Sequence, residues 1–191
     1  MYSLPTSIEM EGVEYNIQNK GDFRMVLDAF NVLNDEELTE KERIICSLII
    51  FYEDLNDIED LAIFPDVEEA IKKMFEFFSA GVPEGNKNSP KLIDWEGDEG
   101  LIIPAINNVA KQEVRALDYL HWWTFIGYYI SVGESTLSTV VSIRDKIVKG
   151  KKLEKWEREY KRDNPQYFVW NRKTAEDYDN EQWLNSVWNK E

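Results

Sequence analysis

The stretch LDYLHWWTFIGYYI, residues 117–130, constrains the fold more than any other, because six of its fourteen side chains are aromatic. Such a segment must be covered by a membrane, by the protein's own core or by another chain. Its most apolar part, residues 119–132, contains His121 and is shorter than the roughly 20 apolar residues that span a bilayer. The start of the chain also lacks the features of a secretion signal. We therefore expect a cytosolic protein with no membrane partner.

Hydrophobic periodicity predicts a mainly α fold, a compact helical domain of about six helices with a short N-terminal β-hairpin. Residues 7–17 alternate in character around Glu11-Gly12, which is typical of a hairpin. From Asp22 onward the period is helical, and Thr39 and Glu42 have the spacing of a capping box. Further helices are predicted over about 41–54, from Asp66 to 78, and over about 99–111, where Pro104 is tolerated only if it lies in the first turn. Others are predicted over about 116–132, from Ser135, which can cap its helix, to 149, and in LEKWEREYKR, where Glu157 and Lys161 have the i, i+4 spacing of a surface pair.

The clearest break in this pattern is GVPEGNKNSPK, which is rich in Gly, Pro and Asn. We interpret it as a surface loop, about residues 81–92, within a single helical domain that covers residues 1–165. Residues 166–191 are predicted to form a polar C-terminal tail, which contains Trp170, Trp183 and Trp188.

The charge is distributed unevenly along the chain. The net charge is −15, and residues 1–100 hold 24 acidic and 8 basic residues, whereas residues 144–163 hold nine basic and five acidic residues. Nucleic-acid binding requires a basic surface, so nucleic acid is not an expected partner. The basic segment could meet the acidic half of the chain or a partner, which leaves self-association possible.

Asp118 and His121 stand three residues apart, the spacing of carboxylate and histidine ligands in metal-binding helical bundles. A di-metal site needs a second histidine, but the chain has one histidine and one cysteine, Cys46, and these cannot form a usual zinc site. The sequence also contains no phosphate-binding loop and no nucleophile elbow. We therefore expect no metal, no cofactor and no catalytic residue, and interpret His121 as hydrogen-bonded within a helix interface.

A helix that is apolar almost all round is either enclosed by its own domain or leaves a face for another chain. Trp and Tyr also concentrate binding energy at interfaces, so different faces of the aromatic helix can serve both purposes. Arg144 lies on a largely apolar helix and is predicted to need a carboxylate partner, for which Asp94 and Asp118 are candidates.

Several motifs together resemble one known family. They are Asp94-Trp95 before a helix, Leu120-His121-Trp122-Trp123 with Phe125 two further on, and Ile143-Arg144 followed by KGKKL. Over about residues 8–165 the chain resembles the bacteriophage gene-product-fifteen family, which is grouped with the tail assembly chaperones of long-tailed phages and prophages of Gram-positive bacteria.

The resemblance implies a non-catalytic chaperone, in the cytoplasm of the bacterial host, that binds and solubilises the tape-measure protein before the tail tube polymerises. The major tail protein is a possible second partner. The implied partner-binding residues are Trp95, His121, Trp122, Trp123 and Arg144. One alternative is a phage-encoded acidic regulator that binds a host protein, which predicts rows of surface carboxylates and enclosed aromatics. An enzymatic alternative would require a metal or substrate near Asp118 and His121.

Overall fold

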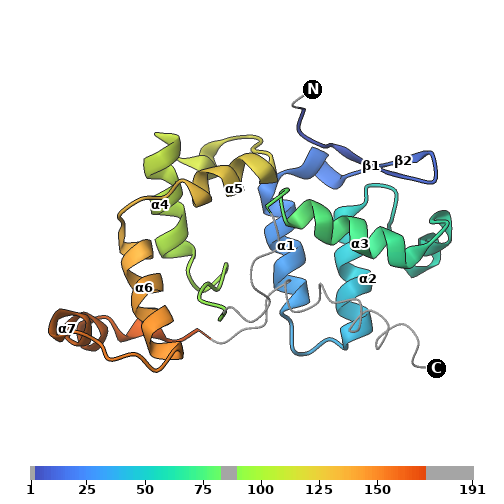
Figure 1. The fold of residues 1–191 in the computed structure, drawn as a ribbon. Helices are drawn as coiled ribbons and strands as arrows, with labels where there is room; N and C mark the ends of the chain where they lie inside the picture. The colour runs from blue at the N-terminus through green and yellow to red at the C-terminus, as the bar shows by residue number, and fades with distance from the viewer. Residues whose placement is uncertain (1–2, 83–89, 171–191) are drawn as a thin grey trace. The chain divides into compact units, whose positions relative to one another are not determined.

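The structure of the protein is a computed structural model that describes residues 3–82 and 90–170 (Figure 1). The fold is mainly α-helical with an N-terminal β-hairpin, as predicted. The described chain divides into two compact units. Residues 3–82 and 119–125 form the N-terminal unit, and residues 90–118 and 126–170 form the C-terminal unit. The extent of a single domain over 1–165 stays a prediction, and most of the predicted loop and tail lies outside the described residues.

The N-terminal unit begins with the predicted hairpin. Strand β1, Ser7–Met10, pairs antiparallel with β2, Val13–Asn16. The two residues between the strands, Glu11 and Gly12, have φ values of 49° and 80°. Positive φ at both central residues is the mark of a type I′ turn, whose twist matches that of the flanking strands.

Three helices complete the framework of this unit, namely α1 (Phe23–Leu33), α2 (Glu40–Phe51) and α3 (Val67–Phe78). Their starts confirm the predicted caps. The Asp22 carboxylate accepts a hydrogen bond from the Arg24 N–H, Thr39 and Glu42 form the reciprocal capping box, and Asp66 accepts from the N–H groups of Glu68 and Glu69. Helices α1 and α2 pack side by side (Figure 1). The core includes the buried residues Val26, Leu33, Ile44, Leu48, Phe51, Ile71 and Met74.

The prediction of a helix over 116–132 is wrong at its start. Helix α5 covers only Trp122–Ile130, and Leu117 has an extended backbone. The reason lies in a long-range pairing. The Phe23 N–H donates to the Leu120 carbonyl at 2.9 Å, and the Leu120 N–H donates to the Asp22 carboxylate at 2.8 Å. These bonds hold residues 120 and 121 against the start of α1, so Asp118 and His121 do not share a helical face.

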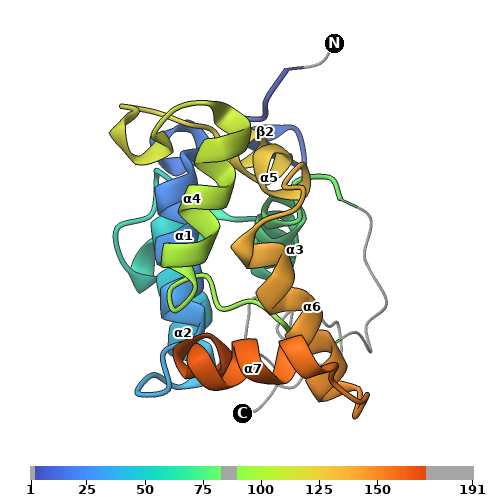
Figure 2. The same cartoon turned by 90° about the vertical axis from the view of Figure 1, so that its left-hand side faces the viewer.

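The C-terminal unit contains α4 (Glu99–Ala110), α6 (Thr136–Val148) and α7 (Lys155–Asp163), followed by a 3-10 turn at Pro165–Phe168. Helices α4 and α6 pack against each other (Figure 2). Ser135 caps α6 as predicted, in a reciprocal box with Ser138. Two details differ from expectation and concern Pro104 and Glu157.

Pro104 was expected in the first turn of its helix, but it is the sixth residue of α4. An internal proline removes one helical N–H and crowds the carbonyl four residues earlier. That carbonyl belongs to Gly100, and both Gly100 and Pro104 are exposed. Water can therefore reach the Gly100 carbonyl, which makes an internal proline tolerable at this position.

Glu157 was expected to pair with Lys161 along the exposed face of α7. Its side chain is instead buried, contacts the Lys146 amine at 2.5 Å and accepts the Glu154 N–H at 2.8 Å. The i, i+4 spacing was correct for a surface pair, but Glu157 lies on the side of α7 that faces α6.

Among the helices of residues 3–82 and 90–170, none combines the length and hydrophobicity needed to cross a bilayer.

Candidate functional site

The four consecutive residues Leu120 to Trp123 contact three different segments of the N-terminal unit. Leu120 pairs with the start of α1 through its backbone. His121 contacts the Pro5 carbonyl at 2.9 Å. The two tryptophans bind the end of α3. The motif thus joins the chain before β1, the start of α1 and the end of α3.

The tryptophan side chains complete the hydrogen bonding at the C-terminus of α3. The last carbonyls of a helix have no partner within the helix. The Trp122 Nε1–H donates to the Phe78 carbonyl at 2.9 Å, and the Trp123 Nε1–H donates to the Phe77 carbonyl at 3.0 Å. Trp122 is only 1% exposed, whereas Trp123 is half-buried. Trp122 therefore belongs to the core, and Trp123 presents part of its ring at the surface.

His121 is held as a neutral ring in one tautomer. Its Nδ1 accepts the Trp123 N–H at 3.0 Å, so the proton lies on Nε2, which donates to the Pro5 carbonyl. Gly21, with φ of +78°, approaches the ring so closely that an added Cβ would lie 3.0 Å from Nε2. Burial lowers the pKa of His121 below its usual 6.5, while the Pro5 carbonyl and Asp22 act in the opposite direction.

This geometry predicts a specific dependence of stability on pH. A lowered pKa means that the unfolded chain binds a proton at His121 at a higher pH than the folded chain does. The contribution of the neutral His121 ring to the free energy of unfolding is therefore fully present above about pH 6.5. It is lost as the pH falls through the pKa that His121 has in the folded protein. Because the chain has one histidine, NMR titration of ¹⁵N-labelled imidazole reports this group alone.

His121→Gln provides the control, since it removes the titrating group. Between pH 7 and pH 5.5, the free energy of unfolding should fall less steeply in the variant than in the wild type. A measured pKa at or above 6.5 would contradict the assignment of a neutral, buried ring.

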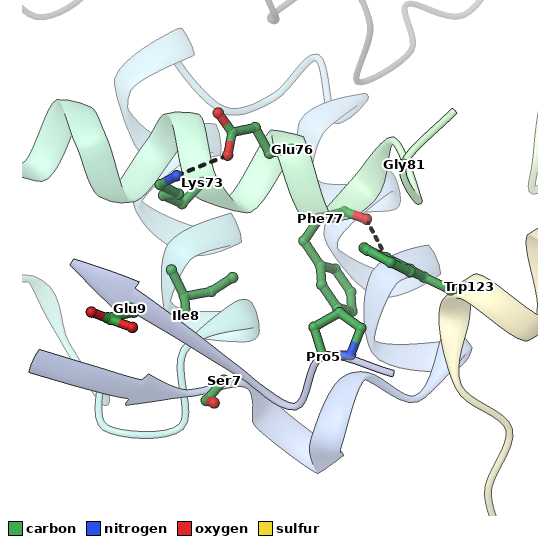
Figure 3. Close-up of a pocket in the computed structure, with 9 residues that line it drawn as sticks. All are labelled: Pro5, Ser7, Ile8, Glu9, Lys73, Glu76, Phe77, Gly81 and Trp123. Carbon is green, nitrogen blue, oxygen red and sulfur yellow. Dashed lines mark hydrogen bonds and ion pairs between the residues drawn. The ribbon is translucent and has the colours of Figure 1, made fainter. Parts of the chain in front are cut away.

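An open pocket of about 290 Å³ lies beside this motif, between β1 and the second half of α3 (Figure 3). Its apolar surface comes from Ile8, Phe77, Pro5 and the indole of Trp123, and Figure 3 shows these side chains converging on one space. The remaining lining residues are Ser7, Glu9, Lys73, Glu76 and Gly81. Lys73 and Glu76 form an ion pair of 3.1 Å. An apolar floor with a charged rim suits the side chain of a binding partner.

His121 supports two walls of this pocket without lining it. It bonds to the carbonyl of Pro5 through Nε2 and to the N–H of Trp123 through Nδ1. The Trp123 indole is fixed a second time through its bond to the Phe77 carbonyl. The pocket is therefore pre-formed by hydrogen bonds that are made within the N-terminal unit.

Arg144, another predicted site residue, is fully buried in the C-terminal unit. The need for a carboxylate partner is met by Asp98, whose two oxygens lie 2.5 and 2.8 Å from the guanidinium nitrogens. The predicted partners, Asp94 and Asp118, were wrong. Asp98 is favoured because it is buried at the start of α4, where its carboxylate also accepts the Asp94 N–H. The guanidinium donates further to the carbonyls of Leu92 and Tyr167 and lies 4.6 Å from the Trp170 ring centroid.

The five predicted partner-binding residues thus fall into two groups. His121, Trp122 and Trp123 lie together in the N-terminal unit, whereas Trp95 and Arg144 lie in the C-terminal unit, where Trp95 is half-buried with its ring 5.1 Å from that of Tyr129. Only Trp123 of the five lines the pocket. Partner binding through these residues stays a prediction.

The sequence patterns did not identify the other pocket residues. Ile8 and Glu9 were predicted as part of a hairpin and Phe77 as part of a helix, but no local pattern places a hairpin beside the end of a particular helix. The only available signal was the pair of adjacent tryptophans, whose indole N–H groups need buried acceptors.

Within the described residues, no group of three or more His, Cys, Asp or Glu side chains is arranged to hold a metal ion.

The family model described as Bacteriophage Gp15 protein matches residues 1–168. The chain belongs to this family. The match includes the hairpin, every residue that lines the pocket, the Leu120–Trp123 motif and Arg144, and it confirms the resemblance inferred from the sequence. No curated protein and no solved structure matches the chain.

Proposed function

We propose that this Gp15-family protein is a tail assembly chaperone, which binds the tape-measure protein in the host cytoplasm and keeps it soluble until the tail tube forms around it. Membership of a bacteriophage family supports a role in the phage. The observation that carries the binding role is the open apolar pocket at Trp123, whose walls are held in place by the motif residues. No covalent step is part of this proposal.

The physical basis is protection of apolar surface. A long, apolar, helical polypeptide aggregates when its surface is exposed before assembly. A chaperone with a net charge of −15 would keep the complex dispersed through repulsion between like-charged particles. Many copies, each bound weakly through a small apolar site, could cover a long partner and still be displaced as tube subunits add.

Co-expression tests this function directly. The tape-measure protein of the same phage should be insoluble alone and become soluble, and co-purify, when the wild-type chain is present. An unrelated acidic protein of similar size and charge is the matched control for a general effect of charge. If the wild-type chain and this control act alike, the chaperone function is wrong.

The alternative role as an acidic regulator of a host protein requires its aromatic side chains to be enclosed. Tyr119 and Trp156 are instead 46% and 51% exposed, and Trp123 contributes to an open pocket. These observations favour a protein that binds apolar segments over one that only presents negative charge.

A further inference from the structure

Two carboxylates face each other across the hairpin, and one of them belongs to a residue that lines the pocket. The strand register places Glu9 directly opposite Glu14, and both side chains are exposed. Glu9 lines the pocket, and so does Ser7, whose hydroxyl donates to the Glu14 carboxylate. Like charges directly opposite each other destabilise an antiparallel pair. The hairpin therefore carries an electrostatic cost at the edge of its apolar pocket.

The hairpin's own sequence does not offset this charge. Residues 5–17 contain three glutamates and no lysine or arginine. Lys73, which lines the opposite wall, forms its ion pair with Glu76. Alternation along β1 directs Ile8 toward α3 and Glu9 to the other face of the hairpin (Figure 3). A cation supplied by a partner would therefore relieve the repulsion between Glu9 and Glu14 at the edge of β1, next to the pocket opening.

We propose that the pocket binds one large apolar side chain of the tape-measure protein and that a lysine or arginine near that side chain in the sequence pairs with Glu9 and Glu14. This inference rests on the proposed function and specifies its docking site. The volume of about 290 Å³ is at the lower end for small-molecule sites and suits a side chain. The acidic rim disfavours phosphate-bearing ligands, because those require a basic surface.

The charge component is tested with E9K, and E11K is its matched control. Glu11 lies in the turn of the same hairpin and does not line the pocket. Both variants replace a glutamate with a lysine, so they change the net charge equally. E9K should weaken binding of the tape-measure protein roughly tenfold, or about 1.4 kcal/mol, whereas E11K should bind within about twofold of wild type. E9K should also raise the melting temperature, since it replaces a like-charge pair with an opposite-charge pair.

The apolar component is tested with I8E, compared with V13E. Ile8 lines the pocket, whereas Val13 lies on β2 of the same hairpin and is 52% exposed. I8E should abolish co-purification of the tape-measure protein, and V13E should preserve it. Circular dichroism on both variants verifies that the helices remain folded.

Carbodiimide cross-linking identifies the partner's residues, because it joins a carboxylate to a lysine amine in contact with it. Mass spectrometry of the wild-type complex should find Glu9 or Glu14 linked to a lysine that lies within about one helical turn of a large apolar residue. If wild type binds but E9K and I8E bind equally well, the docking site is wrong while the chaperone function stands. If wild type itself does not bind, the chaperone function fails first.

Discussion

Trp122→Ala is expected to reduce the free energy of unfolding by about 3–5 kcal/mol, the usual range for removing a buried aromatic side chain. Trp122 is 1% exposed, and its ring lies 5.6 Å from Phe30 and 5.7 Å from Phe125 between centroids. The substitution also removes the donor to the Phe78 carbonyl. The loss therefore combines a large cavity with an unsatisfied buried acceptor.

Urea denaturation followed by far-ultraviolet circular dichroism measures this effect. Trp156→Ala is the control, because Trp156 is 51% exposed on α7 and an exposed substitution usually changes stability by less than about 0.5 kcal/mol. If the two variants lost similar stability, Trp122 could not be the core residue that the structure shows.

The positions of most helices were predictable because their starting signals are local. Asp22, Thr39, Asp66 and Ser135 each accept a backbone N–H within the next three residues. A cap of this kind depends on a few neighbouring positions, so a single sequence contains all the information that it requires. The type I′ turn at Glu11-Gly12 was predictable for the same reason.

The start of α5 was not predictable, because it is set by residues almost a hundred positions away. The apolar pattern continues upstream of Trp122, but the backbone of Leu120 is paired with Asp22 and Phe23. Tertiary hydrogen bonds thus override the local preference. The same limit applies to Arg144. Its need for a carboxylate followed from burial on an apolar helix, but the choice of Asp98 depends on how α4 and α6 pack.

The candidate pocket illustrates how a core motif can also shape a surface. Trp122 and Trp123 are adjacent in sequence and cap adjacent carbonyls of α3, but one is enclosed and the other half-buried. The family resemblance implied both as candidate binding residues, and the sequence did not distinguish the enclosed ring from the exposed one. In the structure, both indoles donate to carbonyls at the end of α3. The Trp122 ring is enclosed in the core, whereas the Trp123 ring forms a wall of the pocket.

The second large effect is expected for Arg144→Met, which should destabilise the C-terminal unit by about 3–5 kcal/mol. The variant leaves the Asp98 carboxylate buried without its cation, at a site where the side chain is 5% exposed. It also removes the donors to the Leu92 and Tyr167 carbonyls and the cation beside Trp170. Hydrogen exchange should show the largest loss of protection in α4, in α6 and around residue 167.

A double variant separates the cost of the unpaired charge from the loss of packing. Arg144→Met combined with Asp98→Leu should be more stable than Arg144→Met alone, because a buried ion pair replaced by apolar groups of similar size loses little, whereas one unpaired charge costs much. Arg162→Met is the control for an exposed ion pair, since Arg162 contacts Asp163 at the surface, and it should change stability by less than about 1 kcal/mol. Equal losses in the single and double variants would show that the guanidinium acts through its carbonyl and ring contacts, and that its pairing with Asp98 contributes little.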